Sequence, residues 1–120
     1  MKKLFLLLAV IIIMPLSLLA NKTSVKIVAP DSAAIGETIK ITIDVKHKGN
    51  SSRHFTDWVF IKINGEEVKR WEFTRSNLPD DQEFQLVYEF EAESTVEIEI
   101  KGNCNLHGST GSVKKKIVVN

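Results

Sequence analysis

The residues that could bind a transition metal are confined to two short stretches of the sequence. His47 and His54 lie in "KHKGNSSRHFTDW", whereas Cys104 and His107 lie in "GNCNLHGSTGS". A Cys-x-x-His pair delivers a thiolate and an imidazole from one turn to one metal ion. The chain has three histidines and one cysteine in total, so all of its imidazoles and its thiol fall within these stretches. We therefore take His47, His54, Cys104 and His107 as candidate metal ligands.

A simpler interpretation is that the three histidines are unrelated surface residues and the thiol is buried and inert. Both stretches are rich in Gly, Asn, Ser and Thr, as loops are, and histidine is common in loops. Against this interpretation, a single cysteine cannot form an internal disulfide, and an exposed free thiol outside the cell would be oxidised. The residues alone leave both interpretations open.

The first twenty residues have the pattern of a secretory signal peptide. Two lysines precede an almost entirely apolar run from Leu4 to Leu19, and Ala20 offers a small residue at a cleavage point. The alternative is an uncleaved membrane anchor, although the run is slightly short for a spanning helix and contains Pro15. No cysteine directly follows the run, which excludes a bacterial lipoprotein anchor. We expect residues 1–20 to be a signal peptide and the protein to be periplasmic or extracellular.

The remaining residues, 21–120, suffice for one domain with one modest core. Removing Lys2 and Lys3 from the 16 basic residues leaves 14 against 15 acidic residues, a formal charge of −1. A nucleic-acid-binding domain would carry a basic stripe, which is not present here. We expect no nucleic-acid partner and no membrane contact beyond the signal segment.

The sequence after residue 21 contains short strand patterns separated by turn signals. In "ETIKITIDVKH" apolar and polar residues alternate, and Asn64-Gly65 is typical of a tight hairpin turn. The expected strands lie within residues 24–30, 37–47, 57–65, 66–73, 83–92, 94–103 and 112–119. This pattern predicts an all-β fold, a seven-stranded immunoglobulin-like antiparallel β-sandwich.

Strand parity places two candidate ligands on the core side of the predicted sandwich. His47 shares the parity of Val45, and Cys104 shares that of Ile100. If neither strand is bulged, both side chains leave the core face at strand ends, where loops on a β-sandwich commonly carry function.

Two motifs resemble the iron-binding domain of superoxide reductases, the desulfoferrodoxin and neelaredoxin family. "HFTDW", from His54 to Trp58, is similar to the family's His-x-x-x-Trp, and "CNLHG", from Cys104 to Gly108, is similar to its Cys-Asn-x-His-Gly. His47 corresponds to the histidine that precedes the first motif. The opening "VKIVAPDSAAIGETIKITIDV" is also similar to the start of the family domain, so that the resemblance spans nearly all of residues 21–120.

The resemblance implies a mononuclear non-haem iron site, cycling between Fe²⁺ and Fe³⁺, that reduces superoxide to hydrogen peroxide. It implies imidazole ligands from His47, His54 and His107 and a thiolate from Cys104. Lys22 matches the family lysine that attracts superoxide, and it is therefore the candidate catalytic residue. An unknown electron-donor protein would supply the reductant, since the chain has no further cysteines for a second redox centre.

One family ligand is absent from this chain. When the Ala-Pro turns are aligned, the family's first histidine falls at Thr23, so the chain supplies three imidazoles and not four. Two alternatives to the reductase follow. One is a metal carrier or electron-transfer module, although the methionine usual in copper sites of this kind is missing. The other is a family member that has lost the full site and does not catalyse the reaction.

Overall fold

The computed structural model describes residues 22–120. The predicted signal peptide, residues 1–20, lies outside this range. The described chain forms eight strands: β1 (Ser24–Val28), β2 (Ser32–Ala33), β3 (Thr38–Lys46), β4 (Thr56–Ile63), β5 (Glu66–Glu72), β6 (Glu83–Glu91), β7 (Val96–Cys104) and β8 (Val113–Val119). Between residues 22 and 120 there is no helix long and apolar enough to cross a membrane.

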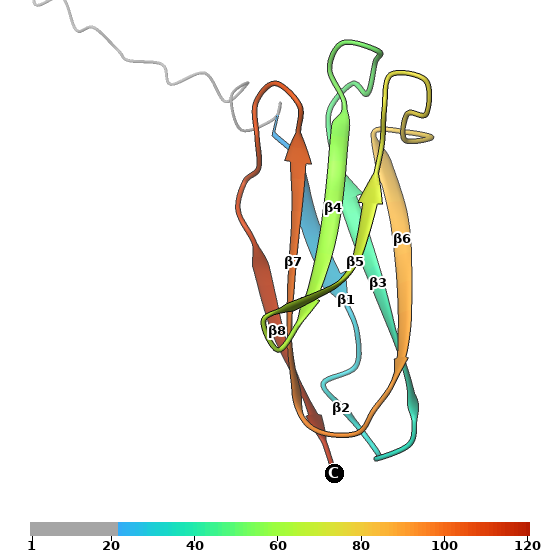
Figure 1. The fold of residues 1–120 in the computed structure, drawn as a ribbon, viewed down its shortest axis with the longest axis vertical. Helices are drawn as coiled ribbons and strands as arrows, with labels where there is room; N and C mark the ends of the chain where they lie inside the picture. Colours follow the sequence, from blue (N-terminus) through green and yellow to red (C-terminus); the bar gives the residue numbers. More distant parts are fainter. Residues whose placement is uncertain (1–21) are drawn as a thin grey trace, which may run out of the picture.

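The strands form two facing sheets, as Figure 1 shows. One sheet has the order β1-β3-β6, and the other has the order β2-β8-β7-β4-β5. All pairings are antiparallel except the short pairing of β2 with β8. This architecture confirms the predicted all-β sandwich.

The structure differs from the prediction by one strand. Each of the seven expected strands is present, and the additional β2 pairs in parallel with the end of β8 through Ser32↔Val118 and Ala33↔Val119. A two-residue strand that follows Pro30 is too short for alternation to be visible in the sequence. Its pairing depends on β8, which lies more than 80 residues further along the chain.

Alternation of buried and exposed residues along the strands builds the core. In β3 the residues Ile39, Ile41, Ile43 and Val45 are almost fully buried, and the intervening residues are more exposed. β7 repeats the pattern with Val96, Ile98 and Ile100, which come from the facing sheet. Burying each such side chain stabilises the fold by roughly 1.5–3 kcal/mol before the cost of chain entropy. The candidate ligands sit where these two buried rows end.

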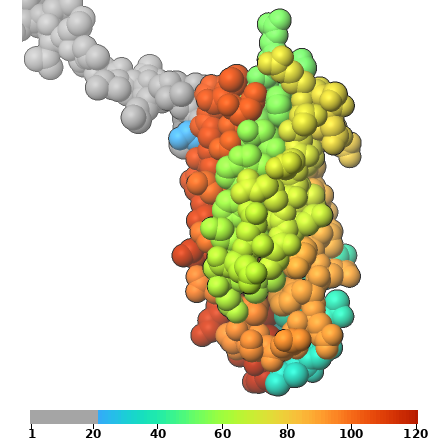
Figure 2. Space-filling model, viewed as in Figure 1, coloured from blue at the N-terminus to red at the C-terminus, as the bar shows by residue number. Residues whose placement is uncertain are grey.

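Three loops meet at the end of the sandwich drawn uppermost in Figure 1. They connect β3 to β4, β5 to β6 and β7 to β8, and the start of β1 lies beside them. In the space-filling view, residues from the loops before β4 and before β6 project at this tip (Figure 2). All four candidate ligands belong to this end, because β3 and β7 run toward it and β4 leaves from it.

Candidate metal centre

His47 directly follows β3 and is buried, with 2% of its surface exposed. Its backbone N–H donates to the carbonyl of Gln82, which holds it against the loop before β6. On one side of the ring, Nδ1 lies 2.7 Å from Asn50 Oδ1. On the other side, Nε2 lies 3.2 Å from His54 Nε2. The buried strand therefore presents one ring nitrogen of His47 to the interior of the site.

His54 lies at the centre of the imidazole cluster. The backbone groups of His54 and Ser51 exchange two hydrogen bonds, at 2.8 and 3.2 Å, which close a tight turn just before β4. His54 Nε2 lies 3.2 Å from His47 Nε2 and 3.0 Å from His107 Nδ1. The rings meet edge to face, with centroids 4.5 and 4.8 Å apart. His54 Nε2 is thus in contact with one ring nitrogen of each of the other two histidines.

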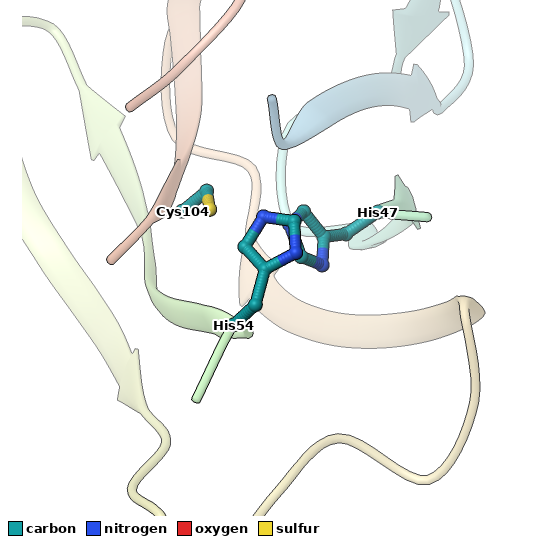
Figure 3. Close-up of side chains that lie close together, drawn as sticks. All are labelled: His47, His54 and Cys104. Carbon is teal, nitrogen blue, oxygen red and sulfur yellow. The ribbon is translucent and has the colours of Figure 1, made fainter. Parts of the chain in front are cut away.

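Cys104 ends β7 and is buried, with 1% of its surface exposed. Backbone hydrogen bonds in both directions between Cys104 and Gly108 close the turn that carries His107. Gly108 has a φ of 77°, which glycine adopts without steric cost. The backbone N–H of His107 points at Cys104 Sγ over 3.5 Å. Figure 3 shows the sulfur directed toward the rings of His47 and His54.

Asn105 ties the two loops of the site together. Its Oδ1 accepts a hydrogen bond from the backbone N–H of Phe55 at 2.9 Å, and its own backbone N–H donates to the Phe55 carbonyl at 3.0 Å. Its Nδ2 donates to the carbonyl of Arg53. Because Phe55 follows His54 and Asn105 follows Cys104, these bonds set the distance between the imidazole and the thiol.

The donor atoms of three candidate ligands lie close enough together to share one metal ion. The ligand atoms of His47, His54 and Cys104 all lie within 4.8 Å of one another. Nitrogens about 2.0–2.1 Å from one metal are about 2.9 Å apart at a right angle and about 3.4 Å apart at the tetrahedral angle. The observed separations of 3.2 and 3.0 Å agree with this range. His107 is not one of these three mutually close residues, and its ring contacts the group only at His54 Nε2.

A family model for desulfoferrodoxin matches residues 18–110. The chain belongs to the desulfoferrodoxin family. Solved structures are also similar to it. A superoxide reductase (neelaredoxin) from Ignicoccus hospitalis superposes with a TM-score of 0.68 and 20% identity, over 82% of this chain and 83% of that one. A search among curated proteins gave no match.

Two further structures show how widely this sandwich occurs. A proposed superoxide reductase from Thermotoga maritima has a TM-score of 0.63 and 23% identity, over 81% of this chain and 86% of that one. The CARDB domain of a Pyrococcus furiosus protein, solved with di-metal ions, has a TM-score of 0.60 and 16% identity, over 83% and 94%. At these identities the likeness concerns the fold, and function must be argued from the site.

Thr23 is the residue that the sequence resemblance aligns with a family histidine. It is fully buried, and its Oγ1 lies 2.9 Å from Thr56 Oγ1. Its backbone accepts from the N–H of Thr110 and donates to the carbonyl of Gly108. A buried hydroxyl pair therefore lies beside the site. Thr56 also pairs with Cys104 across β4 and β7, so this hydroxyl pair adjoins the thiol end of the cluster.

Lys22, the predicted catalytic residue, lies beside the cluster and not within it. It lines a cavity of about 220 Å³ together with His47 and two other lysines, Lys46 and Lys48. Lys46 also forms an exposed ion pair with Glu83 at 3.6 Å. The structure thus brings Lys22 and one face of His47 to the same cavity, and the catalytic role of Lys22 stays a prediction.

Sequence reasoning identified the four candidate ligands and missed the residues that hold them. Asn50, Asn105 and the Thr23–Thr56 hydroxyl pair were not singled out for any structural contact. Asparagines in loops are so common that their type gives no signal. Some of their partners are backbone groups distant in sequence, such as the Asp81 carbonyl for Asn50 and the Phe55 N–H for Asn105, and only the folded chain brings these within reach.

Proposed function

We propose that this protein is a superoxide reductase-like oxidoreductase with one iron ion at the His/Cys cluster. The observation that carries the proposal is that the ligand atoms of His47, His54 and the buried Cys104 lie together, with His107 in contact with His54. Membership of the desulfoferrodoxin family supports iron as the metal and superoxide as the substrate. The ferrous ion would supply the single electron that, with two protons, converts superoxide to hydrogen peroxide.

The protein's own residues would hold the metal and leave room for the substrate. His47, His54 and His107 would donate ring nitrogens, and Cys104 would donate a thiolate, which is a strong electron donor. The His107 N–H directed at Cys104 Sγ would stabilise the sulfur when it binds a metal as thiolate. Four ligands leave coordination positions free on an ion that accepts six.

The lysine-lined cavity would bring the anionic substrate to the site. Lys22, Lys46 and Lys48 outnumber the one carboxylate that lines the cavity, Glu83, so the charge around this face of His47 is net positive. Charge of one sign around a concave surface raises the local concentration of an oppositely charged ligand, and salt weakens the effect. Lys22→Ala should therefore slow superoxide reduction without changing iron content, and the loss should shrink as salt is added. Lys40→Ala, on an exposed position of β3, is the matched control.

The first experiment is the metal content and visible spectrum of anaerobically purified protein. Near-stoichiometric iron, with a sulfur-to-iron charge-transfer band that Cys104→Ser removes, is the expected result. A superoxide assay on the iron-loaded protein then tests the reaction itself. Iron binding without superoxide reduction would reject the proposed reductase activity and support the proposed metal site. Absence of any bound metal would reject both.

A metal carrier or electron-transfer module is the second candidate. The Thr23–Thr56 contact favours this second candidate, because Thr23 then supplies a hydroxyl to Thr56 and no fourth imidazole to the metal. Three histidines and one cysteine also suit copper or zinc in tetrahedral coordination. Copper with a thiolate band in the same measurement would select this candidate. We further propose that residues 1–20 direct export, which N-terminal sequencing of the secreted protein would test.

A further inference from the structure

Asn50 makes a set of contacts that determines which of its atoms faces His47. Its Nδ2 donates to the backbone carbonyl of Asp81 at 2.8 Å, and its Oδ1 accepts from the backbone N–H of Thr56 at 3.0 Å. A carbonyl can only accept, and a backbone N–H can only donate. Both partners therefore require the same orientation of the Asn50 amide. The atom 2.7 Å from His47 Nδ1 is consequently the oxygen.

This orientation determines where the proton of His47 resides. A carbonyl oxygen cannot donate, so the hydrogen of the 2.7 Å contact belongs to His47 Nδ1. In a neutral imidazole only one nitrogen carries a hydrogen, and the lone pair is then on Nε2. His47 Nε2 is the nitrogen that faces His54. The lone pair of His47 thus points into the ligand cluster.

The local chain conformation explains how a residue so close in sequence reaches the outer side of the ring. Asn50 follows His47 by three residues, and Gly49 has a φ of 77°, which allows the chain to reverse. His47 itself is buried and tied to the carbonyl of Gln82, next to the Asp81 carbonyl that Asn50 holds. Asn50 therefore joins the turn after β3, the start of β4 and the loop before β6.

We propose that Asn50 is a positioning residue that holds His47 in the Nδ1–H tautomer, with Nε2 ready to bind the metal. A hydrogen bond from the distal N–H of a ligating histidine fixes the ring and makes it a better donor. Loss of such a partner typically lowers metal affinity about 10–100-fold. The inference rests on the proposed metal site, and it concerns neither the identity of the metal nor the reaction.

The first test is the imidazole ¹⁵N spectrum of the metal-free protein at about pH 8, above the ordinary pKa of imidazole. Nitrogen chemical shifts distinguish a protonated from an unprotonated ring nitrogen. We expect the wild-type protein to show His47 protonated on Nδ1, and Asn50→Ala to show a mixture of tautomers. A wild-type spectrum with the proton on Nε2 would overturn the proposal, whatever the variants do.

The second test separates tautomer control from simple loop clamping. Asn50→Asp keeps an acceptor for His47 and for the Thr56 N–H but loses the donor to Asp81. Zn²⁺ affinity, measured by competition with a chromophoric chelator, should fall about 10–100-fold in Asn50→Ala. It should stay within a few-fold of wild type in Asn50→Asp. Asn77→Ala, in the exposed turn between β5 and β6, should match wild type.

Equal losses of Zn²⁺ affinity in the two Asn50 variants, with the His47 tautomer unchanged, would reject the proposal. They would show that Asn50 only holds the loops together through its bond to Asp81. Unchanged affinity and tautomer in Asn50→Ala would reject it as well. Circular dichroism of each variant verifies that it is folded. A negative superoxide assay would reject the proposed reaction and leave the tautomer result intact.

Discussion

Thr23 Oγ1 and Thr56 Oγ1 lie 2.9 Å apart, and both residues are fully buried. The sequence resemblance aligns Thr23 with a family histidine, and Thr56 of β4 pairs with Cys104 of the neighbouring strand β7. Among residues 22–120 no buried side-chain nitrogen or oxygen lacks a hydrogen-bond partner. The Thr23 side chain thus makes a satisfied polar contact and leaves no open gap beside the cluster.

Thr23→Val should destabilise the fold while leaving the four candidate ligands in place. Valine has nearly the same shape but no hydroxyl, so Thr56 Oγ1 would lose its buried partner. A buried polar group left unsatisfied costs about 1–3 kcal/mol. Urea unfolding of the metal-free protein measures the loss. Thr74→Val, at an exposed turn, is the control and should change stability far less. Equal losses would show that the buried contact contributes nothing.

Thr23→His should raise iron occupancy at limiting iron. The substitution offers a fourth imidazole at the position where family members have one, and additional ligands favour an ion that accepts six. Iron per chain after anaerobic loading is the measurement, with Thr23→Val as the control for loss of the hydroxyl. Occupancy equal to that of Thr23→Val would show that a side chain at this position does not reach the metal.

His54→Ala should reduce metal binding more than His107→Ala does. His54 Nε2 contacts both other imidazoles, whereas His107 is exposed and contacts the cluster through His54. Binding of Zn²⁺, followed by chelator competition, compares the two variants. Neither change should cost much folding stability, because neither ring is part of the hydrophobic core. The order would be reversed if His107 were the stronger ligand.

Gly102→Ala should destabilise the sandwich by about 1–3 kcal/mol, the usual cost of overpacking. A Cβ at Gly102 would lie 2.7 Å from Thr23 Cγ2 and 3.1 Å from Val25 Cγ1. Here β1 of one sheet packs directly against β7 of the other, two residues before Cys104. Thermal unfolding measures the effect. Gly111→Ala is a poor control because its φ is 122°, so Ser112→Ala is used. Equal melting temperatures for Gly102→Ala and wild type would contradict the close packing.

Asp31→Asn should make stability less sensitive to acid. The ammonium of Lys115 donates to Asp31 Oδ1 at 2.6 Å and, together with its charge, lowers the pKa of that carboxyl. A carboxyl whose pKa is lowered on folding stabilises the protein above its unfolded pKa of about 3.9. That contribution disappears as the pH falls through the folded value.

The effect of Asp31→Asn should be small, since the pair is exposed. Urea unfolding at neutral pH and near pH 3 would show a difference from wild type that shrinks in acid. Asp80→Asn, an exposed carboxyl before β6, serves as the comparison. A difference that grows in acid would contradict the lowered pKa of Asp31 in the folded protein.

Seven of the eight strands and the types of the candidate ligands were predictable from the residue pattern alone. The alternation in "ETIKITIDVKH" and "TVEIEIK" marks one buried face, because successive side chains of a strand point to opposite sides. The same parity placed His47 and Cys104 at the core-side ends of their strands, where the structure has them. These features are local, so they are readable without the fold.

The tertiary structure decided which residues support those ligands. The partners of Asn50 are the Thr56 N–H and the Asp81 carbonyl, and Thr23 meets a residue 33 positions away. Such contacts depend on the distance between loops that different strands deliver to one end of the sandwich. The distance between the loops cannot be predicted from residue types, because many small packing contacts between the two sheets determine it together.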